Sequence, residues 1–276
     1  MNHNAHSIMN SFKASIKKIF HILVFNFYKL KYSSQKGNLI LVYSMGKVGS
    51  TSIYTELKKK LPFADIFHVH FLSEYWLRKK LPALDKYFHS NIDLGNEIIN
   101  QINKNPYKRI KIITLVREPI IRDISDLFEN WRSVYENIDQ IDIQTLHKRI
   151  DESTHEYTLT WFDTEFKNYT GFNIYEMPFN KEKGYEIYRL ENADILCLKL
   201  EALREVGSKA IKEFLGVSVE ISNRNLSADK QGKNLYMEIK RNYKASESKL
   251  SVVYNSLYMK HFYTEQEIKE LINKWS

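Results

Sequence analysis

The sequence predicts an α/β fold in three layers, with helices on both faces of a central parallel sheet. Apolar runs of strand length, at residues 39–45, 64–71 and 110–116, alternate with segments whose apolar residues recur at helical spacing. Such alternation is typical of strand-helix-strand units, whose parallel strands are covered on both faces. The 276 residues, 43% of them hydrophobic, can bury one sizeable core. We therefore expect a single domain over residues 36–276 and a separate extension over residues 1–35.

The other elements follow from the same patterns, taken in chain order. They are expected at residues 51–61 (helix), near 72–103 (helical), 185–190 (strand), 193–200 (strand) and 201–216 (helix). Gly216 suits the C-terminal cap of the last of these helices, because glycine adopts the left-handed conformation that such caps need. From Lys233 onward the pattern predicts a helical C-terminal extension.

The N-terminal extension is basic, rich in aromatic residues and amphipathic. Its apolar stretch from Ile19 to Phe25 contains His21 and ends at Asn26, which makes it too short to span a bilayer. Lysines around an aromatic helix favour peripheral contact with an anionic membrane surface, and the alternative is packing on its own domain. The segment lacks the small-residue cleavage site of a signal peptide. With Cys197 as the only cysteine, no disulfide can form within the chain, so we expect a cytoplasmic protein, with this extension peripheral at the inner face of the membrane.

The charge balance favours an anionic partner without identifying it. Lysine and arginine number 41 against 33 aspartate and glutamate residues, a formal net charge of +8. The alternative is an ordinary soluble surface. Nucleic acid is not expected as a partner, because the sequence contains no RNA-binding signature, zinc-finger spacing or basic heptad region.

A glycine-bracketed turn, residues 44–52, joins the first predicted strand to the first predicted helix. Gly46 and Gly49 permit close backbone approach, Lys47 supplies a positive charge, and the serines and threonine at residues 50–52 add hydroxyl donors at a helix N-terminus. The turn indicates a P-loop-type phosphate cradle. Nucleoside triphosphatases place lysine directly after the last glycine, whereas Ser50 stands there in this chain. An ordinary strand-helix turn remains the alternative.

The third predicted strand ends in a second group suited to an anion. Arg117 follows the strand, Pro119 suits the first turn of a helix, and Arg122 and Ser125 lie along that helix. Arg117 and Ser125 can converge on one phosphate, or Arg117 can pair with a neighbouring carboxylate such as Glu118. Two anion sites at the ends of two parallel strands indicate one ligand with two phosphate groups.

These residues resemble the sulfotransferases that use 3′-phosphoadenosine 5′-phosphosulfate (PAPS). The 5′-phosphosulfate loop of that family reads Lys-x-Gly-Thr-Thr/Ser, and Lys47-Val48-Gly49-Ser50-Thr51-Ser52 is similar to it. The family's 3′-phosphate site places a serine eight residues after an arginine, which is the spacing of Arg117 and Ser125. Residues 198–216 also resemble the family's late strand, acidic turn and helix. The resemblance implies PAPS as co-substrate, no required metal, and a catalytic role for Lys47 in steadying charge on the leaving phosphate.

More narrowly, the chain resembles the bacterial capsular polysaccharide synthesis proteins. The resemblance is carried by residues 47–52, WFDTEF at residues 161–166, MPFNKEKGY at residues 177–185 and the closing residues 273–276. The usual Asn-Lys-Trp-Tyr-Ser ending of that family lacks its tyrosine here. The resemblance implies a carbohydrate acceptor, a hydroxyl of a cell-surface polysaccharide or its precursor.

The end of the second predicted strand offers a general base. His68 and His70 face the same side, because side chains alternate along a strand. The pair resembles the His-x-His of the heparan sulfate 2-O-sulfotransferases, which implies His70 as the base and His68 as its helper. A histidine of near-neutral pKa suits proton abstraction from a sugar hydroxyl. A buried core pair and a metal site are the alternatives, and Glu74 is the reserve base.

The acceptor site is weakly specified by sequence. Candidate residues for it are the aromatic Trp131, Tyr135, Trp161 and Tyr175 and the basic Arg132 and Lys148. Arg224, Lys230 and Lys233 are candidates to close over the nucleotide. Two further function classes stay open: a non-catalytic nucleotide-binding or scaffolding component of capsule assembly, and a P-loop kinase, which the displaced lysine disfavours.

Overall fold

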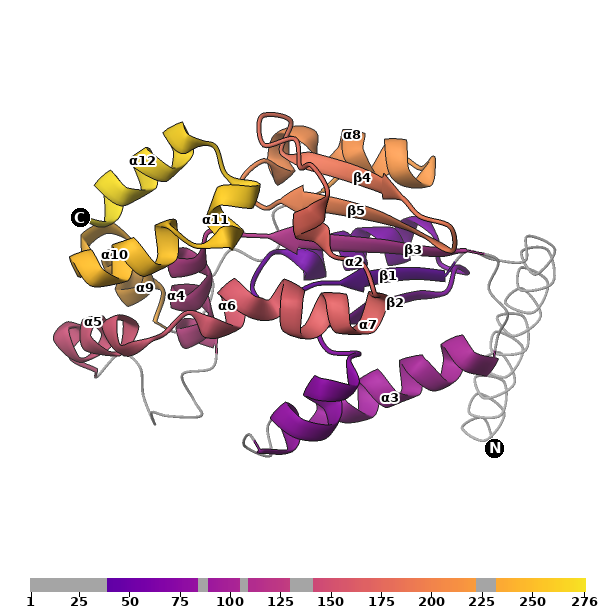
Figure 1. Cartoon of the computed structure of the whole chain (residues 1–276), viewed down its shortest axis with the longest axis horizontal. Coiled ribbons are helices and arrows are strands. Elements are labelled where there is room, and N and C mark those ends of the chain that lie inside the picture. The colour runs from indigo at the N-terminus through magenta and orange to yellow at the C-terminus, as the bar shows by residue number, and fades with distance from the viewer. Residues whose placement is uncertain (1–38, 84–88, 105–108, 130–140, 222–231) are drawn as a thin grey trace, which may run out of the picture.

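The computed structural model describes residues 39–83, 89–104, 109–129, 141–221 and 232–276, which form an α/β fold around a five-stranded sheet (Figure 1). The predicted extension over residues 1–35 lies outside the described residues. So do the candidate residues Trp131, Arg132, Tyr135, Arg224 and Lys230.

The sheet is mixed rather than fully parallel. Its strands are β1 (Leu39–Tyr43), β2 (Ile66–Val69), β3 (Ile110–Val116), β4 (Tyr185–Arg189) and β5 (Ala193–Lys199), in the order β2-β1-β3-β5-β4. The first three strands and β5 are parallel as predicted, and β4 pairs antiparallel with β5. The expectation of a parallel sheet is therefore wrong at this edge. Only residues 190–192 connect β4 to β5, closed by Leu190 N–H donating to the Ala193 carbonyl at 2.9 Å, and a parallel crossover needs a much longer connection.

The predicted helices are present, and the helices between residues 143 and 176 were not predicted. Those before β4 are α2 (Ser50–Lys60), η1 (Trp76–Lys80), η2 (Leu81–Ala83), α3 (His89–Lys104), α4 (Pro119–Glu129), α5 (Ile143–Glu152), α6 (Glu156–Trp161), η6 (Phe162–Lys167), α7 (Asn168–Thr170) and η7 (Ile174–Glu176). Those after β5 are α8 (Leu203–Leu215), α9 (Lys233–Asn242), α10 (Glu247–Tyr254), α11 (Leu257–Phe262) and α12 (Glu265–Trp275). The predicted cap is confirmed, since Gly216 ends α8 at φ 75°. The helical C-terminal extension is confirmed as α9 to α12.

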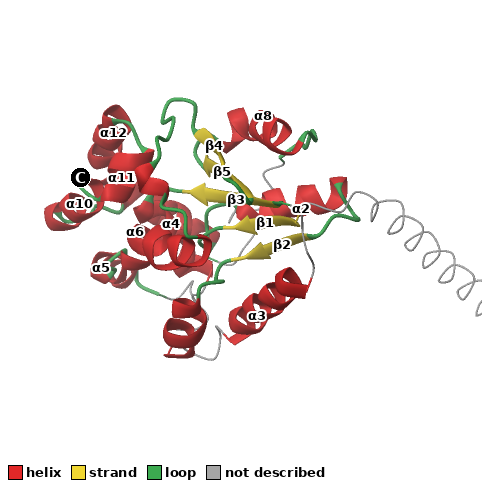
Figure 2. Cartoon of the chain, turned by 45° about the vertical axis from the view of Figure 1, so that its right-hand side comes forward, coloured by secondary structure: helices red, strands yellow, loops and turns green. Residues whose placement is uncertain are grey.

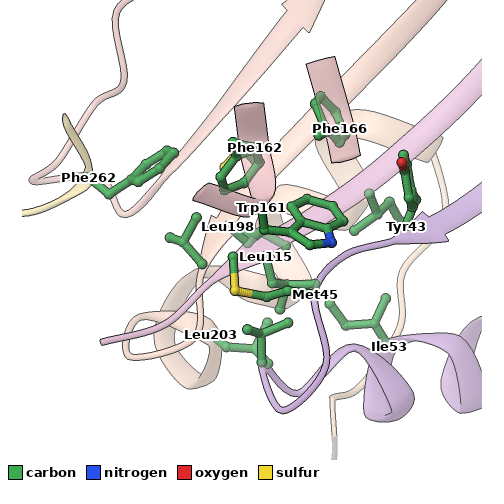
Figure 3. Packing of buried hydrophobic residues seen from close by; sticks show 14 of the residues in the cluster. Tyr43, Met45, Ile53, Leu115, Trp161, Phe162, Phe166, Leu198, Leu203 and Phe262 are labelled. Atoms are coloured by element: carbon green, nitrogen blue, oxygen red, sulfur yellow. The ribbon is translucent and has the colours of Figure 1, made fainter. Parts of the chain in front are cut away.

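The core joins the sheet to aromatic residues of α6 and η6. The Tyr43 ring lies 5.3 Å from the Trp161 ring and 5.4 Å from the Phe166 ring, and all three are fully buried (Figure 3). Ile53 of α2 and Leu203 of α8 belong to the same cluster. Cys197 is buried within β5 as a small apolar residue, as predicted. The structure establishes a mixed α/β sheet with many helices, and the P-loop-type three-layer arrangement stays a prediction.

Strands β1, β2 and β3 point their carboxyl ends toward α4 and α6 (Figure 2). Ligands of open α/β sheets bind at that end, which makes it the place to look for a site. Among the helices of the described chain, none is long and apolar enough to cross a membrane.

Candidate functional site

A cavity of about 850 Å³ opens beyond the carboxyl ends of β1 and β2. Its lining includes Gly46 and Lys47 from the loop after β1, His70 from just after β2, and Arg122 from α4. Three segments that lie far apart in the sequence therefore meet at one hollow, as the strand order predicts.

The loop from β1 to α2 has a backbone that glycine makes possible. Lys47 lies at φ 68° and Gly49 at φ 81°, both in the left-handed region. The positive φ favours glycine at position 49, and a Cβ there would also lie 2.5 Å from Leu200 Cδ1, so the Leu200 side chain or the loop would have to shift. As the N-cap of α2, Gly49 provides no side chain to cap the first turn. The uncapped N–H groups of α2 can therefore bind an anion.

The other predicted cradle residues occupy different environments. Val48 is fully buried in the core and contributes only backbone. Ser50 is buried and its Oγ lies 2.8 Å from His68 Nε2, while Ser52 N–H donates to the Gly49 carbonyl at 3.2 Å. Thr51 is exposed. The hydroxyl groups of residues 50–52 are thus not a uniform set, since the Ser50 hydroxyl is engaged with a histidine.

Lys47 is a partly buried cation at the edge of the cavity. Its Nζ lies 3.5 Å from Glu129 Oε1. Burial lowers the pKa of Lys47, and the charge of Arg122 adds to this effect, while Glu129 and Asp126 oppose it. Its carbonyl accepts a hydrogen bond from Arg117 Nη1 at 2.6 Å. The two strand-end groups predicted from sequence are therefore in direct contact.

His70 is held in the tautomer that a base requires. Its Nδ1 lies 2.6 Å from the Ser44 carbonyl, and because a carbonyl only accepts, Nδ1 carries the proton. Burial lowers the pKa of His70, with a smaller contribution in the same direction from Lys47 and Arg122. The ring is therefore neutral near pH 7, which leaves Nε2 with a lone pair to accept a proton.

His68 lies beside His70 as predicted, with 4.9 Å between the ring centroids. Burial lowers its pKa to about 3, with a smaller effect from His70. Its Nε2 contacts Ser50 Oγ, so His68 positions the start of α2. No group of three metal-binding side chains occurs within the described segments.

Arg117 and Ser125 lie in different surroundings. Tyr258 OH bonds to both the N–H and the carbonyl of Arg117, at 3.0 and 2.9 Å. Ser125 Oγ donates to the Ile121 carbonyl at 2.9 Å and lies 3.2 Å from Tyr236 OH in α9. Arg117 and Ser125 share no partner among the residues described, and neither lines the cavity. Their convergence on one phosphate therefore stays a prediction.

Arg122 forms a buried network that the sequence did not reveal. Its Nε donates to the Gly46 carbonyl at 3.0 Å, its Nη1 donates to Asp123 Oδ1 at 2.7 Å, and its guanidinium lies 4.7 Å from the Tyr157 ring centroid. Burial opposes its charge, but Asp126 and Asp123 outweigh that effect and raise its pKa. The i,i+4 spacing of Arg122 and Asp126 along the helix was the available signal.

The network continues from Asp123 to α10. His155 Nδ1 donates to Asp123 Oδ2 at 2.5 Å, and Lys249 Nζ lies 3.2 Å from His155 Nε2. Burial opposes ionisation of Asp123, but the hydrogen bond from His155 and the charge of Arg122 hold its pKa well below the usual range. Asp123 is thus an anion at neutral pH that fixes Arg122 in place. Contacts between residues 32 and 94 positions apart in the sequence carry no local signature.

Glu165, inside the WFDTEF run, fixes the segment that follows His70. Its carboxylate accepts hydrogen bonds from Tyr43 OH, from Leu72 N–H and from both the N–H and the hydroxyl of Ser73. Burial raises the pKa of Glu165, although these donors favour the charged form. Trp161 Nε1 also donates to the His70 carbonyl at 3.3 Å. The WFDTEF run therefore positions the base-bearing loop, and its Thr164 also lines the cavity.

Aromatic residues line the cavity beside His70. They are Phe71, Tyr75, Trp76 and Tyr157. Phe71 and Trp76 lie 4.9 Å apart and Trp76 and Tyr157 lie 5.5 Å apart, so the rings form one continuous wall. These residues were not among the predicted acceptor residues, although Trp76 follows His70 by only six positions.

The predicted acceptor and reserve residues lie elsewhere. Trp161 is core, and Tyr175 packs against Phe162 and Phe262, so neither forms an open platform. Lys148, Lys233 and Glu74 do not line the cavity. Lys148 is exposed, 3.8 Å from Glu152, and Glu74 is exposed in an ion pair with Arg78 at 3.0 Å. Lys233 is exposed at the start of α9.

One family model matches the chain, over residues 133–264. The family is NKWYS, described as "putative capsular polysaccharide synthesis protein". The matched region is slightly less than half of the chain; it contains α5 to α11, β4, β5 and the aromatic run of Trp161. It ends before the closing residues and does not include the β1 loop, His70 or Arg122. Comparison with curated proteins and with solved structures gives no match.

Proposed function

We propose that this chain is a sulfotransferase that transfers a sulfuryl group from PAPS to a hydroxyl of a capsular polysaccharide or its precursor. The observation that carries the proposal is the position of His70. Its unprotonated Nε2 belongs to a partly buried neutral ring that lines the same cavity as Lys47 and Gly46 of the glycine loop. A base, a cation and an anion-binding backbone are the three components that this transfer requires.

The sulfuryl donor, PAPS, would bind at the loop after β1 and at the end of β3. The uncapped N-terminus of α2, with Lys47 and Gly49 in left-handed conformations, provides N–H groups for a 5′-phosphosulfate. Arg117, hydrogen-bonded to the Lys47 carbonyl, and Ser125 would hold the 3′-phosphate. The donor supplies an activated sulfuryl group, and the resemblance to PAPS enzymes and the strand order support a P-loop-type fold for this chain.

His70 and Lys47 have different roles: His70 accepts the proton, and Lys47 stabilises the negative charge. His70 Nε2 takes the proton of the acceptor hydroxyl, and the Nδ1–H bond to the Ser44 carbonyl keeps the ring in the orientation this needs. The Lys47 ammonium steadies the negative charge that develops on the leaving phosphate. His68 holds Ser50 and so the start of α2. No metal is assigned to this transfer.

The carbohydrate acceptor would bind against the aromatic wall of the cavity, which is formed by Phe71, Tyr75, Trp76 and Tyr157. Sugar rings pack with their apolar faces on aromatic side chains, and this wall begins directly after His70. The similarity of residues 133–264 to the capsular polysaccharide synthesis family supports a polysaccharide acceptor. A cytoplasmic site, with residues 1–35 contacting the inner face of the membrane, would suit a membrane-bound precursor.

The test is isothermal titration of the full chain with adenosine 3′,5′-bisphosphate and, separately, with ADP and magnesium, for the wild type and Arg117→Ala. Binding of the bisphosphate that is lost in Arg117→Ala supports the proposal. Binding of ADP alone, or of neither nucleotide, contradicts it.

His70→Ala then distinguishes an enzyme from a scaffold that only binds the nucleotide. An enzyme should lose about 10²- to 10⁴-fold in sulfuryl transfer while still binding the bisphosphate. If the wild type binds the bisphosphate but never transfers label from radiolabelled PAPS to capsular material, the scaffold alternative replaces the enzyme.

A further inference from the structure

Arg122 is a buried cation that nevertheless borders the cavity. Its side chain is 6% exposed and lies in the first half of α4. It lines the cavity together with Lys47 and His70. A buried guanidinium at the wall of a cavity is suited to bind an anion there, because the cost of burying the charge has already been met by Asp123 and Asp126.

The nitrogen that can meet such an anion is Nη2. Within the described part of the chain, every hydrogen bond of the Arg122 side chain starts from Nε or Nη1. A Cβ built on Gly46 would lie 3.7 Å from Nη2, which puts this nitrogen directly beside the glycine of the β1 loop. These contacts hold the guanidinium in place. The N–H groups of Nη2 therefore remain available to a ligand where the β1 loop borders the cavity.

The electrostatics of His70 agree with this placement. Burial is the main cause of its lowered pKa, and the charges of Lys47 and Arg122 are the next effects that lower it, with Asp126 opposing them. Both cations therefore act on the same imidazole ring. An anionic group bound among these three side chains would lie within reach of the base.

We propose that Arg122 is a substrate-binding residue that holds the sulfuryl group itself, through Nη2, while Lys47 holds the leaving phosphate. Arg122 has this role only if the proposed function is right, because the sulfuryl group belongs to PAPS. The acceptor oxygen forms a bond to sulfur, and the bond from sulfur to the 5′-phosphate oxygen breaks with its electron pair leaving on the phosphate. The hydroxyl proton goes to His70 Nε2. Arg122 stays cationic throughout and donates hydrogen bonds to the sulfuryl oxygens.

A purely structural role for Arg122 makes a different prediction. As a clamp between Gly46 and Asp123, it would shape the loop for any ligand, so its loss would weaken PAPS and adenosine 3′,5′-bisphosphate equally. As the sulfuryl-binding residue, it would affect only PAPS, because the bisphosphate lacks the sulfuryl group. The ratio of the two dissociation constants therefore separates the two roles.

The experiment measures both dissociation constants for the full chain by isothermal titration, in the wild type, Arg122→Gln and Arg122→Lys. We expect Arg122→Gln to weaken PAPS about 10- to 100-fold, the range for loss of a charge-assisted hydrogen bond, and the bisphosphate less than about threefold. Asp123→Asn is the matched control, because it disturbs the same network and keeps the guanidinium. It should leave the ratio of the two constants unchanged.

Equal changes for both ligands in Arg122→Gln, or no change in either, would overturn the role of Arg122 and leave the proposed function standing. A wild type that binds neither ligand would overturn both. If Arg122→Gln fails to fold, Arg122→Lys decides the question, since an ammonium cannot contact both Gly46 and the sulfuryl group and should still weaken PAPS selectively. In Arg122→Gln, NMR titration should also show a raised His70 pKa, because glutamine removes a positive charge that lowers it.

Discussion

At the scale of single residues, His68 is a partly buried histidine that resists protonation. Its pKa of about 3 in the folded chain lies well below the ordinary value of 6.5, chiefly because of burial. The unfolded chain therefore binds more protons than the folded chain between these two pH values. The free energy of unfolding should fall as the pH decreases from about 6.5 toward 3, by up to about 1.4 kcal/mol per pH unit for this group.

Replacing His68 by asparagine tests this dependence. The variant is expected to lose stability less steeply than the wild type between pH 6.5 and 4, even if it is less stable at pH 7 after losing its bond to Ser50. Urea unfolding at a series of pH values gives both curves. Parallel curves for the two proteins would show that His68 is protonated equally in the folded and unfolded chains.

The tautomer of His70 shows what a sequence can and cannot specify at this scale. The pattern of two histidines separated by one residue on a strand was enough to place both rings side by side. The Ser44 carbonyl that fixes the proton on Nδ1 belongs to another strand end, 26 residues away. Only the folded chain brings that carbonyl to the ring.

At the scale of elements, the β1 loop depends on one glycine. Gly49 combines φ 81° with a position where a Cβ would meet Leu200 at 2.5 Å. Gly49→Ala should therefore cost at least the strain of a left-handed alanine, which is about 1 kcal/mol, and more if the loop rather than the Leu200 side chain shifts to relieve the contact. The strain in the loop should also weaken binding of adenosine 3′,5′-bisphosphate.

Gly216→Ala is the matched control, because Gly216 has φ 75° and no atom within 4 Å of its would-be Cβ. It should cost only the backbone strain and leave ligand binding unchanged. Thermal unfolding and titration of both variants make the comparison. Equal losses of stability and unchanged binding in both would mean that the loop geometry does not depend on the Leu200 contact.

The elements themselves were largely predictable, for a physical reason. Buried parallel strands are continuous apolar runs, and β1, β3 and β5 each gave such a run in the sequence. The orientation of β4 was not predicted, although only residues 190–192 separate it from β5, and so short a connection indicates an antiparallel pair. In contrast, the contacts of Arg122 with Gly46 and of Asp123 with His155 join separate elements, and no local pattern encodes them.

At the scale of the whole molecule, Glu165 ties together three distant parts of the chain. Tyr43 in β1, the segment Leu72–Ser73 after β2, and η6 all meet at this carboxylate. Glu165→Gln would replace one acceptor oxygen by a donor that faces other donors. We expect it to lower the free energy of unfolding by about 1 to 3 kcal/mol for each buried donor left unpaired.

Asp163→Asn provides the control within the same helix, because Asp163 is exposed. It should change the free energy of unfolding by less than about 0.5 kcal/mol. Chemical denaturation of both variants measures the difference. If Glu165→Gln were as stable as Asp163→Asn, the carboxylate would not be the tie between these segments.

The β4–β5 hairpin has a consequence for the order of events in folding. Among the described strands it is the only pair joined by a short turn, whereas β1, β2, β3 and β5 pair across long connections. Closing a long loop costs more chain entropy than closing a short one, so the hairpin should be structured early in the transition state. The cavity needs β1, β2 and α4 together and so forms late. A full-length chain that refolds would therefore form the β4–β5 edge of its sheet before it acquires any capacity to bind a ligand.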